Sequence, residues 1–195
     1  WFPAQKSTRS KLASLFPSPK KLWLYSQKRV EKYGANPSLF ALFIAFSYMI
    51  PFFMHSYAEP AIYNWLLAVR GMGALLCVGL LLQAYWPEHW ISYFPAYYHF
   101  CVLYCLPFVT TVLLLFEGGN TEWIVNVTLA IMFLIVLVDW LSFVILSALG
   151  VSLGFLFYQL AIGPINLNLD FSTGYLLVYQ GLFATLIGLL FARRK

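Results

Sequence analysis

The chain has 195 residues, of which 62% are hydrophobic, 19% aromatic and only 10% charged. Soluble domains contain about 25% charged residues, so this composition excludes an ordinary soluble fold. It predicts an all-α polytopic membrane protein, because helices satisfy their own backbone groups in lipid. The net charge of +5 comes from basic residues that flank apolar runs. That placement favours binding to anionic lipid headgroups over binding to nucleic acid.

Residues 1–35 form a basic, amphipathic segment that contains no membrane span. Eight of the twelve Lys and Arg residues lie there, among apolar side chains such as Trp23 and Tyr25. Segments of this kind lie in the membrane interface. Pro17 and Pro19 interrupt the segment, so we expect an interfacial helix only after them. The sequence therefore predicts a cytoplasmic segment at 1–35 and a membrane domain at 36–195.

Six apolar runs follow, and a span needs about 20 apolar residues. Pro37 suits the first position of the first helix, and Pro107 predicts a kink in the third. One run of about 38 residues is too long for a single span, so we divide it at Asp139, which would cap the following helix. The predicted spans lie at about 37–54, 61–83, 95–116, 123–138, 141–160 and 173–191.

The distribution of positive charge predicts the orientation of the chain. Basic residues cluster before the first span and after the last, and an even number of spans places both ends on the same side, the cytoplasm. The aromatic turn at 85–90 is typical of a membrane interface. The chain begins with Trp1 instead of Met and ends on Arg193-Arg194-Lys195, so we expect a longer parent protein with a C-terminal soluble part.

Arg70 is the one basic residue inside the apolar region. A cation at bilayer depth costs at least ~2.5 kcal/mol, so it should face the bundle interior and have a partner. Gly71 and Gly73 would let a neighbouring helix approach closely. Arg70 could donate to a polar ligand or form a switching ion pair. The alternatives are a structural pair or a side chain that reaches the outer interface, and both interpretations stay open.

Three further polar positions are candidate ligand contacts. His99 lies near the inner end of the third span, where it could titrate or bind a ligand, or be a hydrogen-bonded interfacial histidine. Trp123 and Asn126 are three residues apart and so lie near one face of a helix. Their indole N–H and amide would suit a ligand that has hydroxyl and keto oxygens, although an interfacial Trp is also ordinary.

The sequence gives little sign of catalysis or metal binding. Cys101 and Cys105 would share a helix face with metal-ligand spacing, but small, polarizable packing residues are the favoured interpretation for these and for Cys77. The zinc-protease, nucleophile-elbow and phosphate-loop motifs are missing from the sequence. We therefore expect no catalytic residue, metal or cofactor in this region.

One stretch resembles a known family. The run from Trp90 to Phe100 (WISYFPAYYHF), continuing to the Cys-Leu-Pro-Phe at 105–108, is similar to the membrane sensor region of the CqsS/LqsS-type quorum-sensing hybrid histidine kinases. The Leu-x-x-Arg that ends at Arg70, Trp123 after a polar turn and the basic exit from the last span also match. The resemblance covers roughly residues 36–195.

The resemblance implies a receptor for an α-hydroxyketone autoinducer, which has a small polar head on an alkyl tail. In that family the ligand switches a cytoplasmic kinase from autophosphorylation to phosphatase output, and phosphate passes through a receiver domain. The resemblance also implies a multi-pass protein of the bacterial inner membrane, a homodimer and a downstream phosphorelay partner.

The resemblance also assigns roles to individual residues. Trp123 matches the Trp that contacts the ligand head, and Asn126 falls where the family has a Ser. Phe183 matches a Phe that lines the tail pocket. Phe191 falls where the family varies between small and bulky side chains, so it would shorten that pocket. Asp139 stands where the family has a His, which leaves the role of that position in doubt.

Two other functions stay open for a chain of this kind. A six-span sensor could be attached to a different output domain, such as a cyclase, and the residues after Lys195 would decide this. A small transporter or channel subunit would need a hydrophilic path, and the predicted spans contain few polar residues beyond Arg70, Asn126 and Gln159. An intramembrane enzyme is disfavoured by the missing motifs.

Overall fold

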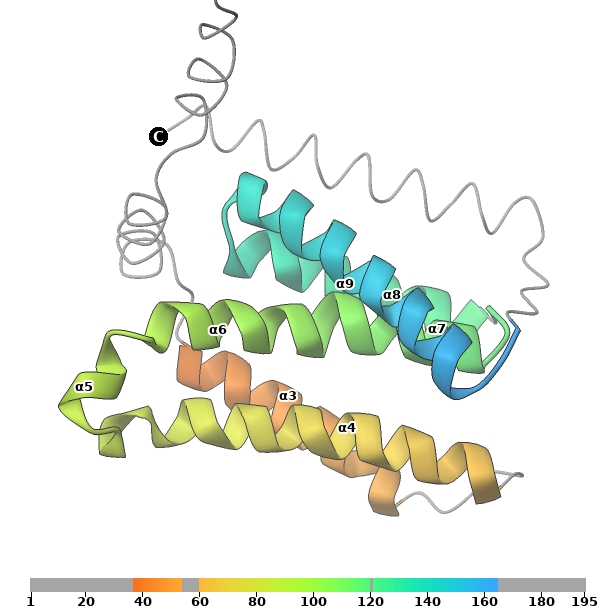
Figure 1. Ribbon diagram of the computed structural model, residues 1–195, viewed down its shortest axis with the longest axis horizontal. Coiled ribbons are helices and arrows are strands. Elements are labelled where there is room, and N and C mark those ends of the chain that lie inside the picture. The colour runs from red at the N-terminus through yellow and green to blue at the C-terminus, as the bar shows by residue number, and fades with distance from the viewer. Residues whose placement is uncertain (1–36, 54–59, 120, 165–195) are drawn as a thin grey trace, which may run out of the picture.

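The computed structural model describes residues 37–53, 60–119 and 121–164, and the regular structure within these ranges is helical (Figure 1). This confirms the predicted all-α class for the described part. The elements are α3 (Pro37–Phe53), α4 (Pro60–Leu81), a 3₁₀ turn η1 (Leu82–Tyr85), α5 (Glu88–Ile91), α6 (Phe94–Leu103), a π-helical turn η2 (Tyr104–Phe108), α7 (Val109–Phe116), α8 (Thr121–Leu137) and α9 (Trp140–Ala161).

Five of the six predicted spans fall on described residues, and each is helical. Three helical stretches are long and apolar enough to cross a membrane, namely Asn64–Tyr85, Phe94–Phe116 and Trp140–Ala161, whereas α3 and α8 contain shorter apolar helices. Pro37 is helical in α3, and the break around Asp139 is confirmed. The predicted sixth span and the amphipathic segment 1–35 lie outside the described residues, and the orientation of the chain stays a prediction.

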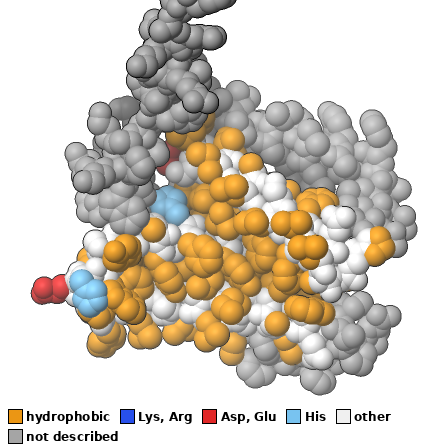
Figure 2. Space-filling view, viewed as in Figure 1, with side chains coloured by type: hydrophobic (Ala, Val, Ile, Leu, Met, Phe, Trp, Pro, Cys, Tyr) orange, Lys and Arg blue, Asp and Glu red, His pale blue; other side chains and the backbone are white. Residues whose placement is uncertain are grey.

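The outer faces of the helices are apolar. Hydrophobic side chains cover most of the described surface in Figure 2, and Phe46, Leu75 and Val136 are among the exposed ones. Monomeric soluble proteins rarely expose a continuous apolar surface of this extent. The described helices therefore have the surface of a multi-pass membrane protein.

The third span lies in the middle of the bundle. It consists of α6, η2 and α7 in continuous succession, and Figure 1 shows it between the α3–α4 pair and the α8–α9 pair. Its side chains are the most completely buried of the three long stretches. Tyr98, Val102, Val109 and Val112 are fully enclosed. The local geometry of this span therefore influences how both helix pairs pack against it.

The predicted kink at Pro107 coincides with the π-helical turn η2. Proline has no N–H and disturbs the regular backbone hydrogen bonds around it, and lipid offers no water to replace them. Hydroxyl groups bond to three successive carbonyl oxygens here: Tyr48 of α3 donates to Cys105, Thr110 to Leu106 and Thr111 to Pro107. Side-chain hydroxyls thus add hydrogen bonds to the backbone within the π turn.

Two glycines of α9 pack directly against this turn. A Cβ on Gly150 would lie 2.5 Å from Cγ of Pro107, and one on Gly154 would lie 2.9 Å from Cβ of Thr111. Small residues four apart let two helices approach closely in a membrane. The Gly150-x-x-x-Gly154 spacing is therefore the feature that lets α9 approach the π turn.

Asp139 occupies the position before α9, as predicted. Its backbone is extended, and its carboxylate accepts a hydrogen bond from the hydroxyl of Ser142 at 2.7 Å. The side chain thus bonds to another side chain of the first turn and not to a backbone N–H. Asp139 lies between α8, which ends at Leu137, and α9, which begins at Trp140, so the predicted break is confirmed, whereas the predicted side-chain cap is not formed.

Replacing Gly150 with Ala should destabilise the bundle by about 1–3 kcal/mol, because the added methyl would overlap the rigid Pro107 ring. The same change in an open helix would stabilise it by about 1 kcal/mol. The free energy of unfolding can be measured by denaturant titration in mixed micelles. Ser152→Ala, at an exposed position of α9, is the matched control. A Gly150→Ala protein as stable as this control would show that the close approach does not matter.

Candidate ligand-binding site

Arg70 and Trp123 meet in the interior of the bundle. Arg70 of α4 is only 7% exposed. Its guanidinium carbon lies 5.4 Å from the centroid of the Trp123 ring on α8. The expectation that Arg70 faces inward and has a partner is therefore confirmed. The partner is an aromatic face, supplied by a helix on the other side of the third span.

The aromatic contact offsets only part of the cost of burying this charge. A cation at bilayer depth costs at least ~2.5 kcal/mol, and a desolvated cation–π contact contributes about 2 kcal/mol. The ring face attracts positive charge but is a poor hydrogen-bond acceptor. A guanidinium has five N–H donors, which are best satisfied by oxygen atoms. An oxygen acceptor near Arg70 would therefore complement the aromatic contact.

The third span holds α4 through side chains that donate to its backbone. Tyr97 donates to the carbonyl of Leu76 at 2.9 Å, and Tyr104 donates to the carbonyl of Val69 at 3.0 Å. Val69 immediately precedes Arg70. These bonds fix the position of α4 along the third span and thereby the depth at which Arg70 lies.

The three cysteines fill the same interface. The thiol of Cys101 lies 3.7 Å from the carbonyl of Leu76, and that of Cys105 lies 3.7 Å from the carbonyl of Gly73. The sulfurs of Cys77 and Cys105 are 3.8 Å apart, and all three thiols are buried and free. No group of three potential metal ligands comes together among the described residues. The packing interpretation of the cysteines fits this arrangement.

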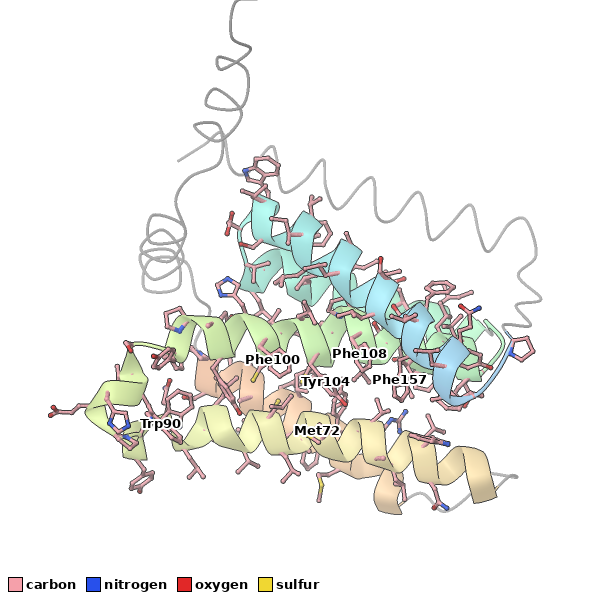
Figure 3. The ribbon with its side chains drawn as sticks, viewed as in Figure 1. Met72, Trp90, Phe100, Tyr104, Phe108 and Phe157 are labelled. Atoms are coloured by element: carbon pink, nitrogen blue, oxygen red, sulfur yellow. The ribbon has the colours of Figure 1, made fainter. Side chains whose placement is uncertain are left out.

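A row of aromatic rings crosses from the third span to α4. Figure 3 shows Tyr104 and Phe108 on the third span and Phe157 on α9. The ring centroids of Tyr104 and Phe108 are 4.9 Å apart, and those of Phe108 and Phe157 are 5.7 Å apart. Phe157 also contacts Trp65 at 6.0 Å. Sequence analysis missed this row, because the spacing of aromatic residues within one span does not show which ring of another span they meet.

His99 has a local structural bond. Its Nδ1 lies 2.7 Å from the carbonyl oxygen of Pro95 in the same helix, and its ring meets the edge of Tyr98 at 5.8 Å. This arrangement favours the hydrogen-bonded histidine that sequence analysis kept as an alternative. A role of His99 in ligand binding stays a prediction.

The other predicted contacts are placed less centrally. Asn126 follows Trp123 by one turn, but its side chain is exposed whereas Trp123 is half-buried. Phe183 and Phe191 lie outside the described residues. The structure thus brings Arg70 and Trp123 together, and ligand binding by all six predicted positions stays a prediction.

A curated protein supports the resemblance. Over 123 residues the chain is 30% identical to the CAI-1 autoinducer sensor kinase/phosphatase CqsS of Vibrio cholerae. The matched residues are 63% of this chain but only 18% of that protein, so the chain corresponds to a small part of its relative. No protein-family model and no solved structure matches the chain. The chain is thus a membrane helical region similar to part of this sensor kinase.

A double-mutant cycle should detect the contact between Arg70 and Trp123. We expect Arg70→Met and Trp123→Leu to show a coupling energy of about 1–2 kcal/mol in the free energy of unfolding, because the charge lies over the ring in a desolvated site. Arg70→Met combined with Trp86→Leu is the control cycle, since Trp86 packs against Tyr97 and Trp90. Additive effects in both cycles would argue against an energetically important cation–π contact.

Proposed function

We propose that this chain is the membrane receptor region of a bacterial quorum-sensing histidine kinase and binds an autoinducer of the α-hydroxyketone class. The observation that most strongly supports this function is the buried Arg70 guanidinium over the Trp123 ring. The similarity to CqsS, which is named as an autoinducer sensor kinase, supports the same class of ligand.

The chemistry of Arg70 suits the head of such a ligand. An α-hydroxyketone has oxygens on adjacent carbons, and a guanidinium presents its N–H donors as a planar fork that can contact two neighbouring oxygens. The indole N–H of Trp123 is a further donor that the ligand could use. A plain alcohol or ketone offers one oxygen and would satisfy fewer of these groups.

The surroundings of Arg70 suit the tail. Small-molecule sites are mostly apolar with a few placed polar groups, and the aromatic rings near Arg70 fit this description. Each buried methylene contributes about 0.8 kcal/mol, or roughly fourfold in affinity. Phe183 and Phe191 belong to the proposal as tail contacts on the strength of the resemblance alone. A bulky Phe191 would favour shorter tails.

The proposed output requires a ligand that distinguishes two helix arrangements. A ligand shifts a conformational equilibrium only by its difference in affinity for the two states. Arg70 and Trp123 belong to helices on opposite sides of the third span, so a head that bonds to both would favour one spacing of α4 and α8. In the proposal, this spacing sets the kinase or phosphatase output of a cytoplasmic part, in a homodimer that acts on a phosphorelay partner.

A transporter is less well supported. Among the described residues, Arg70 and Thr111 are the buried polar or charged side chains, and the hydroxyl of Thr111 is bonded to Pro107. These groups do not form a continuous hydrophilic path. A sensor with a different output domain stays compatible with the same ligand site.

Binding of synthetic α-hydroxyketones with graded tails should test the proposal directly. We expect selective thermal stabilisation of the purified chain, with a rise of about fourfold in affinity per methylene up to an optimum length. Trp123→Ala should abolish this stabilisation while the protein stays monodisperse. Alcohols and ketones of equal length are the controls. Equal, feeble shifts from all compounds would indicate nonspecific partitioning and would contradict the proposal.

The tail-length optimum should depend on Phe191. We expect Phe191→Cys to move the optimum toward longer tails, because a smaller side chain would lengthen the proposed pocket. The same graded series measures this shift, with Phe133→Cys at an exposed position of α8 as the control. An unchanged optimum in Phe191→Cys would remove this residue from the tail site but would leave the head site intact.

A further inference from the structure

Tyr104 contacts α4 on both sides of Arg70. Its hydroxyl donates to the carbonyl of Val69, the residue before Arg70, at 3.0 Å. Its ring lies beside Gly73, where an added Cβ would come within 3.5 Å of Cε1 of Tyr104. Gly73 is three residues after Arg70 and so lies on nearly the same helix face. Tyr104 therefore contacts the turn of α4 that presents Arg70 to Trp123, beside the thiol of Cys105, which lies at the carbonyl of Gly73.

We propose that Tyr104 is a positioning residue for the ligand-binding site, which sets the orientation of Arg70 against Trp123. Its participation in ligand binding rests on the function proposed above. Its effect on the Arg70–Trp123 contact does not, because that contact is made between two side chains of the chain itself. No family resemblance assigned this role to Tyr104.

The surroundings of Tyr104 fix its ring and its hydroxyl. The ring lies 4.9 Å from Phe108 and 6.4 Å from Phe100, measured between centroids. A Tyr hydroxyl in an apolar environment needs a hydrogen-bond partner, and the carbonyl of Val69 provides it through a second lone pair. Val69 is itself buried. The hydroxyl therefore stays bonded to the carbonyl of Val69 on α4. Moving it away would leave the Tyr104 hydroxyl without a hydrogen-bond partner in lipid.

The π turn connects the contact between Tyr104 and α4 to two further helices. Tyr104 is the first residue of η2, and Pro107 in the same turn receives Gly150 of α9. The hydroxyl of Tyr48 from α3 bonds to Cys105 in the middle of the turn. π turns inside α-helices occur frequently at functional sites. A displacement of Arg70 that moves Tyr104 would thus also move the π turn η2, which α3 and α9 both contact.

Tyr97 provides a matched control within the same span. It is half-buried like Tyr104, and its hydroxyl donates to the carbonyl of Leu76 on α4 at 2.9 Å. Tyr97 differs in two ways. It lies outside the π turn, and its partner Leu76 is six residues after Arg70 along α4. Tyr97→Phe and Tyr104→Phe each remove one oxygen and one bond to α4, so their melting temperatures should fall by similar amounts.

The first test needs no ligand. In lipid nanodiscs, the Nε–H resonance of Arg70 should show a ring-current shift from Trp123, which Trp123→Leu removes. We expect Tyr104→Phe to move this resonance at least half of the way toward its position in Trp123→Leu. Tyr97→Phe should leave it unchanged. An Arg70 resonance at the wild-type position in Tyr104→Phe would overturn the proposal.

The second test uses the α-hydroxyketone of optimal tail length. We expect Tyr104→Phe to weaken its affinity by about fivefold, the effect of one lost hydrogen bond, and Tyr97→Phe to change it less than twofold. Equal losses in both variants would overturn a positioning role for Tyr104 in binding. If the wild-type chain binds no hydroxyketone but the Arg70 resonance moves as expected, the proposed function fails and the positioning role holds.

A third variant distinguishes a positioning role of Tyr104 from a general loss of folding. Incorporating 4-aminophenylalanine at position 104 keeps the ring and restores a donor to the carbonyl of Val69. This variant should return the Arg70 resonance and the affinity toward the wild-type values. If Tyr104→Phe does not fold, the amine variant is compared directly with the wild-type chain, and a resonance at the Trp123→Leu position would count against the proposal.

Discussion

The helix bundle depends on the absence of water from the bilayer interior. Each backbone carbonyl that is released from regular helical bonding must find a donor within the protein. At the π turn of the third span, the hydroxyls of Tyr48, Thr110 and Thr111 add bonds to the consecutive carbonyls of residues 105–107. Two of these donors come from the span itself and one from α3. The irregular turn and the helix packed beside it therefore require one another.

The same constraint explains why the tyrosines of the third span point toward neighbouring backbones. Tyr97 and Tyr104 bond to carbonyls of α4, and Tyr98 bonds to the carbonyl of Leu137 in α8 at 3.3 Å. A carbonyl in a helix can accept a second bond through its other lone pair. These bonds fix the position of each helix along its axis, which apolar packing alone determines poorly. These bonds therefore also determine how Arg70 of α4 and Trp123 of α8 are placed relative to one another along the bundle axis.

Sequence analysis predicted the features that depend on apolar run length and on the cost of isolated charge. The helical class and the break at Asp139 follow from bilayer thickness. The inward position of Arg70 follows from the desolvation of its charge. The helical conformation of Pro37 is compatible with the fixed backbone of proline at the first turn of a helix. These properties are local, so a single sequence contains enough information for them.

The features that sequence analysis missed depend on pairing between helices. Pro107 indicated an irregular turn, but not that α9 would press against it through Gly150. The Gly150-x-x-x-Gly154 spacing was visible and could have predicted a close contact, though not with which helix. Trp123 and Asn126 differ by about 60° around a helix. That offset is enough for the structure to leave Asn126 exposed beside a half-buried Trp123.

Arg70 connects the stability of the bundle to its proposed function. A buried guanidinium over an aromatic ring is destabilising unless its remaining donors find acceptors, because the ring compensates the charge but not the N–H groups. A fold selected only for stability would be better served by an apolar side chain at this position. In the proposed function, a ligand would supply oxygen acceptors to Arg70 in addition to the Trp123 ring. Such a ligand would bind most tightly to the helix arrangement that places Arg70 and Trp123 at the right separation.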